Sequence, residues 1–140
     1  MSPTDKSNLT RPVLSFDFDG VLNASVVDTE PTSFIDPESW IPFNEMIEHI
    51  RMMSQTHRCV VVTARDNWNK PDLLRFIHIH DIPIDDVYCT NDGPKLHILM
   101  KIGAVAHYDD RLSVGKELKD TGIDFWFVNT EERNWKFIWN

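Results

Sequence analysis

The sequence has few cysteines, no long apolar run and fewer bases than acids. Its two cysteines, Cys59 and Cys89, form no C-x-x-C pair, which argues against a disulfide framework and favours reduced thiols in a cytoplasmic protein. No apolar run reaches the ~18–20 residues of a membrane span, so we expect no membrane partner. Lys and Arg number 14 against 22 Asp and Glu, a net charge of −8, which argues against broad non-specific binding to nucleic acid.

The length and composition indicate one globular domain. The chain has 140 residues, 41% of them hydrophobic, and domains cluster near ~100–150 residues. We therefore interpret residues 1–140 as a single domain. It has a loose polar lead-in over 1–10, an irregular loop or flap over 20–40 and an aromatic tail over 131–140.

Short apolar runs alternate with helical patterns along the chain. This alternation predicts an α/β fold of three layers, a Rossmann-like parallel sheet of about five strands with helices on both faces. The predicted strands are 13–18, 59–63, 85–89, 104–108 and 125–128, and the predicted helices are 42–53, 71–79, 95–101 and 112–120.

The tail contains an unusual number of aromatic residues. Trp135, Ile138 and Trp139 have the i, i+3, i+4 spacing of one face of a helical turn. We expect this face to dock on the core of the domain. A homodimer contact through the tail is the first alternative, and base stacking on single-stranded nucleic acid is a weaker one because basic residues are sparse there.

The first four of the predicted strands end in, or are followed by, polar or charged residues. In open parallel sheets ligands bind beyond the carboxyl ends of the strands, so we expect these side chains to meet at one edge. Asp17, Asp19 and Gly20 follow the first strand, Thr63 and Arg65 the second, Asp92 and Lys95 the third, and Asp109, Asp110 and Arg111 the fourth.

This set of residues suits phosphate chemistry. Clustered carboxylates stay ionised only with a cation beside them, and oxygen ligands without nearby His or Cys favour Mg²⁺. One carboxylate can attack phosphorus to form an aspartyl-phosphate, and a second can serve as general acid and base. Thr63 and Lys95 offer donors to the phosphoryl oxygens, and Gly20 lets the backbone approach the phosphate.

In order and spacing these residues resemble the motifs of the haloacid dehalogenase (HAD) superfamily of phosphohydrolases, over residues 13–128. The resemblance implies that Asp17 is the nucleophile and Asp19 the general acid/base. It also implies that Mg²⁺ is held by Asp17, the main-chain carbonyl of Asp19 and Asp110, with Asp109 beside it. The matching residues are Asp17-Phe18-Asp19-Gly20-Val21-Leu22, Thr63, Lys95 and Asp109-Asp110.

No insertion is long enough for a large cap domain, because only about twenty irregular residues separate Asp19 from the helix near Pro42. An open site suits a phosphate on a macromolecule, or a small molecule that a partner subunit closes in.

A narrower resemblance concerns the substrate. Four stretches are similar to the 3′-phosphatase domain of polynucleotide kinases: Val60 to Arg65, Asp92-x-x-Lys95, Asp109-Asp110-Arg111 and Gly122 to Trp126. This likeness implies that Arg65 binds the substrate phosphate, for which a guanidinium offers two parallel hydrogen bonds. Gly20, Asp92 and Arg111 complete the predicted substrate-binding set. No G-x-x-x-x-G-K-[ST] loop is present, so we expect no kinase.

The predicted function is therefore a Mg²⁺-dependent phosphomonoesterase acting on a nucleic-acid 3′ end or a nucleotide. A phosphatase of mononucleotides or other small molecules is an alternative. A non-catalytic phosphate-binding module on the same scaffold is another.

Overall fold

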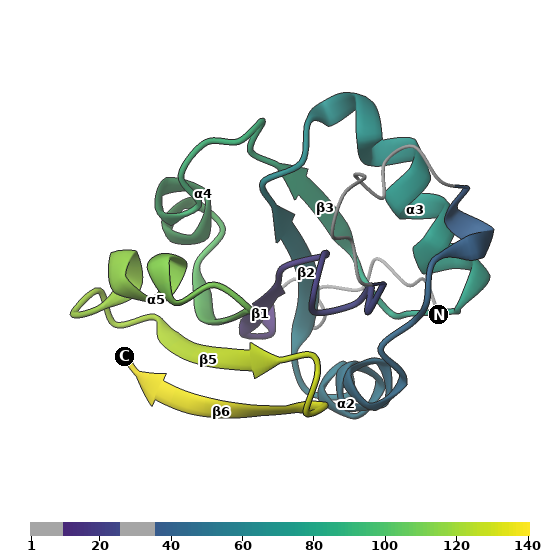
Figure 1. Cartoon of the computed structure of the whole chain (residues 1–140). Coiled ribbons are helices and arrows are strands. Elements are labelled where there is room, and N and C mark those ends of the chain that lie inside the picture. The colour runs from purple at the N-terminus through teal and green to yellow at the C-terminus, as the bar shows by residue number, and fades with distance from the viewer. Residues whose placement is uncertain (1–9, 26–35) are drawn as a thin grey trace.

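Six β-strands form one sheet in the computed structural model, which describes residues 10–25 and 36–140. The first five strands are parallel and the sixth is antiparallel to its neighbour (Figure 1). Their order across the sheet is β3-β2-β1-β4-β5-β6. The strands are β1 (Val13–Phe16), β2 (Arg58–Thr63), β3 (Asp86–Cys89), β4 (Ala104–Asp109), β5 (Asp124–Asn129) and β6 (Asn134–Trp139).

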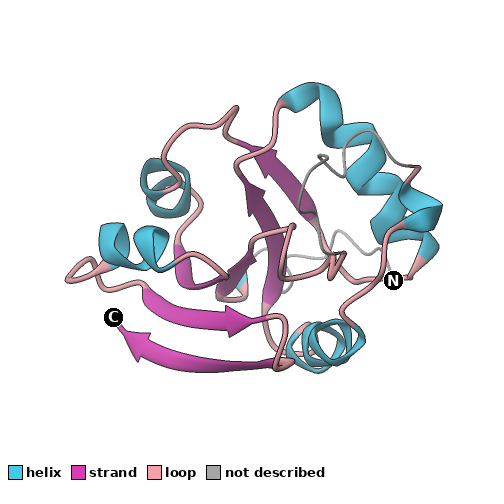
Figure 2. Ribbon diagram, in the orientation of Figure 1, coloured by secondary structure: helices cyan, strands magenta, loops and turns pink. Residues whose placement is uncertain are grey.

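The helices lie on both faces of this sheet (Figure 2). Helices α2 (Asn44–Met53) and α3 (Lys70–Ile79) pack on one face, and α4 (Leu96–Lys101) and α5 (Leu112–Leu118) on the other. Short 3₁₀ helices span Pro37–Ser39 and Asn67–Asn69. The predicted three-layer α/β fold is confirmed, and the described residues contain no cap domain. None of the described helices is long and apolar enough to cross a membrane.

Two hydrophobic cores lie on opposite sides of the sheet. Strand β2 shows why, because successive side chains of a strand point to opposite faces. Val61 belongs to the core under α2 and α3, whereas Val60 and Val62 belong to the core under α4 and α5. A strand buried on both faces needs a continuous apolar run, which this sequence supplies. Cys59 in β2 and Cys89 in β3 are both free, as the sequence predicts.

The strand order changes direction between β1 and β4. The chain first adds β2 and β3 on one side of β1, and it then returns to place β4 on the other side. The carboxyl ends of β1 and β4 are therefore neighbours, and the Asp17 N–H donates to the Tyr108 carbonyl at 2.9 Å. Such a switch point is where open α/β sheets bind ligands.

The aromatic tail is a strand, so the helical interpretation of its spacing is wrong. Strand β6 pairs with β5, and aromatic and β-branched residues suit such a pleated, half-buried surface. The expected docking on the core is confirmed. The Trp135 ring lies 6.0 Å from that of Phe43, and the Trp139 indole N–H donates to the Gly115 carbonyl at 2.8 Å. Self-association through the tail stays a prediction.

The segment over 20–40 is more tightly packed than predicted. Its described parts are irregular, but Val21, Leu22 and Trp40 are buried in the core under α2 and α3. The interpretation as an unpacked flap is wrong for these parts, because apolar residues without a regular period give no local sign of burial. The rest of the predicted flap (26–35), and the lead-in up to residue 9, lie outside the described residues.

Candidate functional site

A cavity of about 230 Å³ opens at the carboxyl ends of β1, β2 and β4. It brings together most of the residues that the sequence singled out. Lys95 and Asp109 are buried beside Asp17, and Gly20 packs against Asp110. The residues lining the cavity are Asp17, Asp19, Thr63, Ala64, Arg65, Asp92, Asp110 and Arg111.

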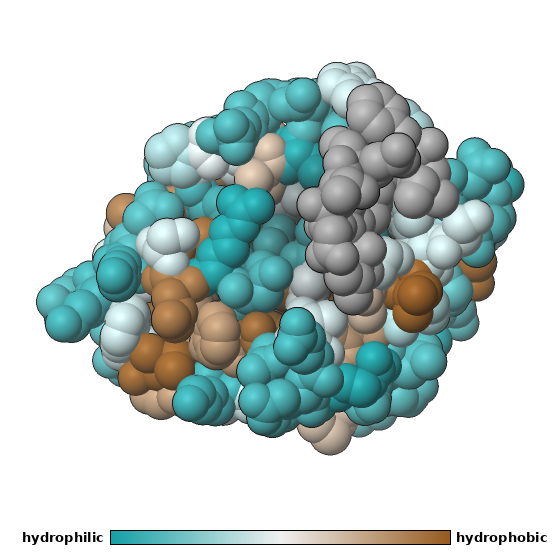
Figure 3. Space-filling view, in the orientation of Figure 1, coloured by the Kyte–Doolittle hydropathy of each residue, from teal (hydrophilic) through white to brown (hydrophobic). Residues whose placement is uncertain are grey.

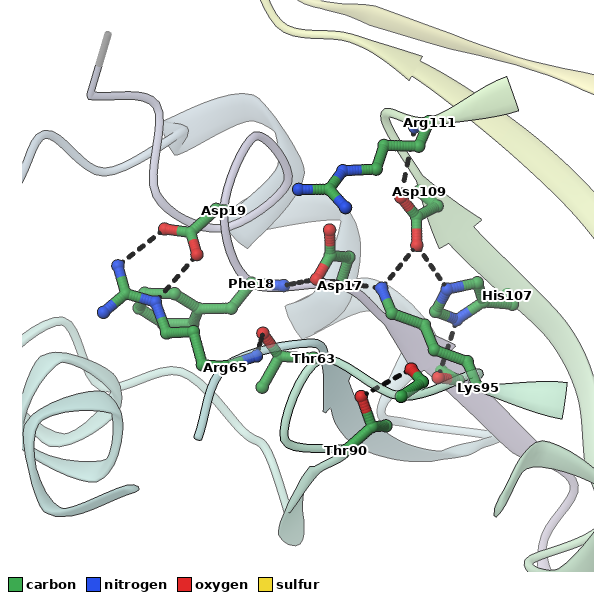
Figure 4. Close-up of polar contacts among 12 residues, drawn as sticks. Asp17, Phe18, Asp19, Thr63, Arg65, Thr90, Lys95, His107, Asp109 and Arg111 are labelled. Atoms are coloured by element: carbon green, nitrogen blue, oxygen red, sulfur yellow. Dashed lines mark hydrogen bonds and ion pairs between the residues drawn. The ribbon is translucent and has the colours of Figure 1, made fainter. Parts of the chain in front are cut away.

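Asp17 follows β1 and is almost fully buried. Its Oδ1 accepts a hydrogen bond from the Phe18 N–H at 2.8 Å and lies 3.1 Å from the Lys95 Nζ (Figure 4). Burial is the main cause that raises the pKa of Asp17 well above its usual value, and the nearby Asp109 carboxylate adds to the rise. The Lys95 ammonium opposes that rise. One oxygen of Asp17 is thus fixed by two donors while the carboxylate borders the cavity.

Lys95 stands at the centre of a buried polar network. Its Nζ lies 2.7 Å from Asp109 Oδ2. The same oxygen accepts a hydrogen bond from His107 Nε2 at 2.8 Å, and His107 Nδ1 accepts one from the Ser15 hydroxyl at 2.8 Å. Burial lowers the pKa of His107. Because a carboxylate oxygen accepts hydrogen bonds, the nitrogen that faces Asp109, Nε2, carries a ring proton. Burial disfavours the charged Lys95, but Asp17 and Asp109 outweigh it and raise its pKa.

His107, whose Nε2 lies 2.8 Å from Asp109 Oδ2, is not among the residues that the sequence singles out. The available signal was the two-residue spacing, which places both side chains on the same face of a strand. His107 is also the direct neighbour of Ser15 across the sheet. Its role is to hold Asp109 toward Lys95.

Both oxygens of Asp109 are occupied by protein donors. Oδ2 contacts Lys95 and His107, and Oδ1 accepts from the Arg111 N–H at 3.1 Å. Burial would raise the pKa of Asp109, but the hydrogen bond from His107 and the Lys95 ammonium hold it well below its usual value. These contacts favour the ionised form of Asp109, which anchors Lys95.

The carboxylates of Asp17, Asp109 and Asp110 could hold a metal ion. Each offers an oxygen within 4.8 Å of the others. Burial and the Asp109 charge raise the pKa of Asp110 to about 6. Three carboxylates face one ammonium here, so a divalent cation would balance the remaining negative charge, and a set of oxygen ligands suits a hard cation. The residues present therefore fit such an ion.

Asp19 and Arg65 form a bidentate ion pair at the rim of the cavity. Arg65 Nε donates to Asp19 Oδ2 at 2.7 Å, and its second nitrogen, Nη2, donates to Oδ1 at 2.8 Å. The guanidinium also lies 4.9 Å from the Trp40 ring centroid, a cation–π contact. Arg65 was predicted to bind phosphate, and here it contacts Asp19 while lining the same cavity. The two residues are 46 positions apart in the sequence, so no local pattern could reveal the pair.

Two loops line the cavity beside this ion pair. The buried Thr63 hydroxyl accepts from the Arg65 N–H at 3.3 Å, which turns the chain at the end of β2. Asp92 lies after β3 with φ +63°, and its N–H donates to the Ala64 carbonyl at 2.6 Å. The two loops are therefore tied together, and the Asp92 carboxylate lines the cavity.

Arg111 supplies an exposed cation at the cavity. Its backbone is fixed to Asp109, while its guanidinium extends toward Asp17 (Figure 4). It is placed to meet an anion that approaches Asp17, since a guanidinium matches the geometry of phosphate oxygens.

Position 20 must be a glycine because the Asp110 carboxylate occupies the space of a side chain there. Gly20 has φ +80°, and a Cβ built there would lie 2.1 Å from Asp110 Oδ2. Any side chain at this position would displace the carboxylate. Gly20 does not line the cavity, so its structural effect is to make room for Asp110.

Substitution Gly20→Ala should weaken divalent cation binding. We expect the displaced Asp110 to lower the affinity for Mg²⁺ roughly tenfold, measured by isothermal titration calorimetry. Gly122→Ala is the matched control, because Gly122 also has positive φ (+87°) but has nothing within 4 Å of its Cβ position. Both variants carry a similar backbone strain of about 1–2 kcal/mol. An equal loss of affinity in both would show that the Asp110 contact is irrelevant.

Comparison with known proteins identifies the fold. No protein-family model and no curated protein matches the sequence. A chain of the "Pnkp1/Rnl/Hen1 RNA repair complex" superposes with a TM-score of 0.70 and 18% identity, over 91% of this chain and 45% of that one. A chain in a second structure of the Pnkp1/Rnl/Hen1 complex gives 0.70 and 17%, over 92% and 51%. The fold is that of part of a chain in an RNA repair complex. The present chain spans about half the length of those chains.

Proposed function

We propose that the protein is a Mg²⁺-dependent phosphatase that hydrolyses phosphomonoesters through an aspartyl-phosphate on Asp17. The proposal rests on the groups that surround the Asp17 carboxylate. Asp17 borders a small cavity, with Lys95 at 3.1 Å, Asp110 beside it and the Arg111 guanidinium extending toward it. A nucleophile, cation ligands and phosphate-binding donors thus converge on one point, which is the arrangement that phosphoryl transfer requires.

The proposed metal ligands are Asp17, Asp110 and the main-chain carbonyl of Asp19, with Asp109 next to them. Bound Mg²⁺ supplies positive charge that offsets the repulsion between a phosphate dianion and the carboxylates. Asp109, whose two oxygens already accept from protein donors, acts mainly by holding Lys95 against Asp17.

In the first step an oxygen of Asp17 attacks phosphorus, and the bond from phosphorus to the ester oxygen breaks. The carboxyl group of Asp19 gives its proton to the departing oxygen. Asp19 accepts two hydrogen bonds from Arg65, so before the first step it must turn out of this ion pair toward the cavity and take up a proton from solvent. In the second step Asp19 takes a proton from water, whose oxygen attacks phosphorus. The bond from phosphorus to Asp17 then breaks and inorganic phosphate leaves.

Three side chains stabilise the phosphoryl oxygens in both steps. Lys95 and Arg111 supply positive charge, and the Thr63 hydroxyl supplies a hydrogen-bond donor. Lys95 and Thr63 need little reorganisation during the reaction, since both are buried and held by partners.

The proposed substrate is a nucleic-acid 3′ phosphate. The resemblance of the sequence motifs to a 3′-phosphatase domain supports it, as does the likeness of the fold to a chain of an RNA repair complex. A mononucleotide phosphatase is the second candidate, because a net charge of −8 weakens the attraction to a polynucleotide.

The test is phosphate release from a 3′-phosphorylated oligonucleotide, the matching 3′-mononucleotide and a 5′-mononucleotide, each with Mg²⁺ and with EDTA. We expect release only with Mg²⁺ and fastest from the oligonucleotide. Preference for a mononucleotide would replace the first substrate by the second. Mg²⁺ binding without release from any of the three would instead support a non-catalytic phosphate-binding module.

A further inference from the structure

The catalytic cavity is too small to enclose a whole nucleotide. Its volume of about 230 Å³ falls below the roughly 300–1,000 Å³ of cavities that bury a small organic ligand. It suits the phosphoryl group alone. If the proposed function holds, the rest of the substrate must lie on a neighbouring surface.

A second hollow lies on the β5–β6 hairpin. It has a volume of about 330 Å³, and we call it the hairpin hollow. In the view of Figure 3, apolar side chains gather over β5 and β6, next to a hydrophilic central area. The residues that line the hairpin hollow are Phe127, Asn129, Glu132, Asn134, Trp135 and Lys136.

The hairpin hollow adjoins the catalytic residues. Phe127 is the direct neighbour of Asp109 in the parallel pairing of β4 and β5, and adjacent strands lie about 4.8 Å apart. At the hairpin turn the Thr130 hydroxyl donates to the Gly20 carbonyl at 2.6 Å. Phe127 of the hollow is thus next to Asp109, and the two residues that follow Asp109, Asp110 and Arg111, line the catalytic cavity.

Four side chains share one face of the hairpin. Phe127 pairs with Lys136, and Asn129 pairs with Asn134, so the alternation of strand residues directs all four to the same side. The Phe127 ring is half-buried, whereas Asn134 and Lys136 are exposed. Asn129 Nδ2 donates to Glu132 Oε1 at 3.2 Å, which holds that acid at the turn. The Asn134 amide and Lys136 ammonium make no hydrogen bond or ion pair with another side chain among the described residues.

This combination matches the chemistry of a nucleoside that carries a second phosphate. An aromatic ring offers a platform for a base, an amide can pair with the base edge, and an ammonium attracts a phosphate. We propose that the hairpin hollow binds the nucleoside whose 3′ phosphate is cleaved, with Lys136 facing the 5′ phosphate of that nucleoside. The inference rests on the proposed function and specifies its substrate.

The first test compares adenosine 3′,5′-bisphosphate, adenosine 3′-phosphate and glycerol 2-phosphate as substrates. We expect Lys136→Gln to lower kcat/KM for the bisphosphate roughly tenfold while sparing the other two. Asn134→Ala should lower kcat/KM for both nucleotides and spare glycerol 2-phosphate. Lys116→Gln, at an exposed position of α5, is the control for loss of one positive charge. Equal losses for all three substrates in Lys136→Gln and Asn134→Ala would overturn the inference.

A second test separates failure of the inference from failure of the proposed function. Isotope-labelled Asp17→Asn protein is titrated with adenosine 3′,5′-bisphosphate and followed by NMR. We expect the largest backbone amide shifts at Phe127, Asn134 and Lys136 in addition to the residues of the catalytic cavity. Shifts at the hairpin without turnover by the wild type would refute the phosphatase and keep the nucleotide site. Turnover by the wild type without shifts at the hairpin would refute the site alone.

Discussion

Asp17→Asn should abolish phosphate release while the protein stays folded. The amide cannot attack phosphorus, and no other carboxylate among the described residues lies in the same contact with Lys95 and the cavity. Loss of a nucleophile costs roughly 10⁴–10⁶ in kcat, so we expect no measurable turnover above background. The measurement is phosphate release under Mg²⁺ saturation with the best substrate of the wild type.

The stability of this variant is a separate expectation. The side-chain amide oxygen of the variant can still accept from the Phe18 N–H and face Lys95, as Asp17 Oδ1 does in the wild type. Removing one charge also relieves repulsion among the three clustered carboxylates. We therefore expect a Tm equal to or above that of the wild type in a circular dichroism melt. Glu117→Gln, at an exposed position of α5, controls for the loss of an acid. Activity within tenfold of the wild type would refute the aspartyl-phosphate mechanism.

Lys95→Met should cost more stability than any other single substitution at the site. The ammonium lies 3.1 Å from Asp17 and 2.7 Å from Asp109, and all three side chains are buried. Without it two buried carboxylates face each other with no cation between them. Breaking a buried ion pair from one side costs about 3–5 kcal/mol, and we expect a loss of this size in the free energy of unfolding by urea. We also expect kcat to fall by roughly 10²–10³.

The matched control lies at the far end of α4, the helix that begins directly after Lys95. Lys101→Met removes a lysine from the exposed end of α4 and should change the free energy of unfolding by no more than about 0.5 kcal/mol. A double variant, Lys95→Met with Asp109→Asn, removes both partners of the closer contact. It should recover part of the lost stability, because one of the two unpaired buried charges is then gone. A cost below about 1 kcal/mol for Lys95→Met alone would show that the buried network does not stabilise the domain.

The order of strands and helices was predictable from local patterns. The β-branched run of β2 and the spacing of Met46, Ile47 and Ile50 in α2 reflect burial that each element makes against its nearest layer. Side chains directly after a strand were also predictable as neighbours, because parallel strands bring their carboxyl ends to one edge. Asp17, Thr63 and Asp110 therefore came together as expected.

Prediction from the local pattern was wrong for the tail, where the same residue spacing is compatible with a helix and with a strand. The spacing of Trp135, Ile138 and Trp139 fits a helical turn, while the same segment is rich in the aromatic residues that strands favour. The strand forms because its pairing with β5 satisfies backbone hydrogen-bonding groups of both segments.

The contacts between side chains of the site depend on the tertiary structure, because they join residues that are far apart in the sequence. The Asp19–Arg65 ion pair joins residues 46 apart, and the Lys95–Asp109 pair joins residues 14 apart. The contact of Gly20 with Asp110 and the placement of Phe127 beside Asp109 likewise depend on strand order and register. The sequence alone shows which residues stand at the end of each strand. Which of them touch is set by the distances between strands, which are fixed only when the sheet and its two cores pack together.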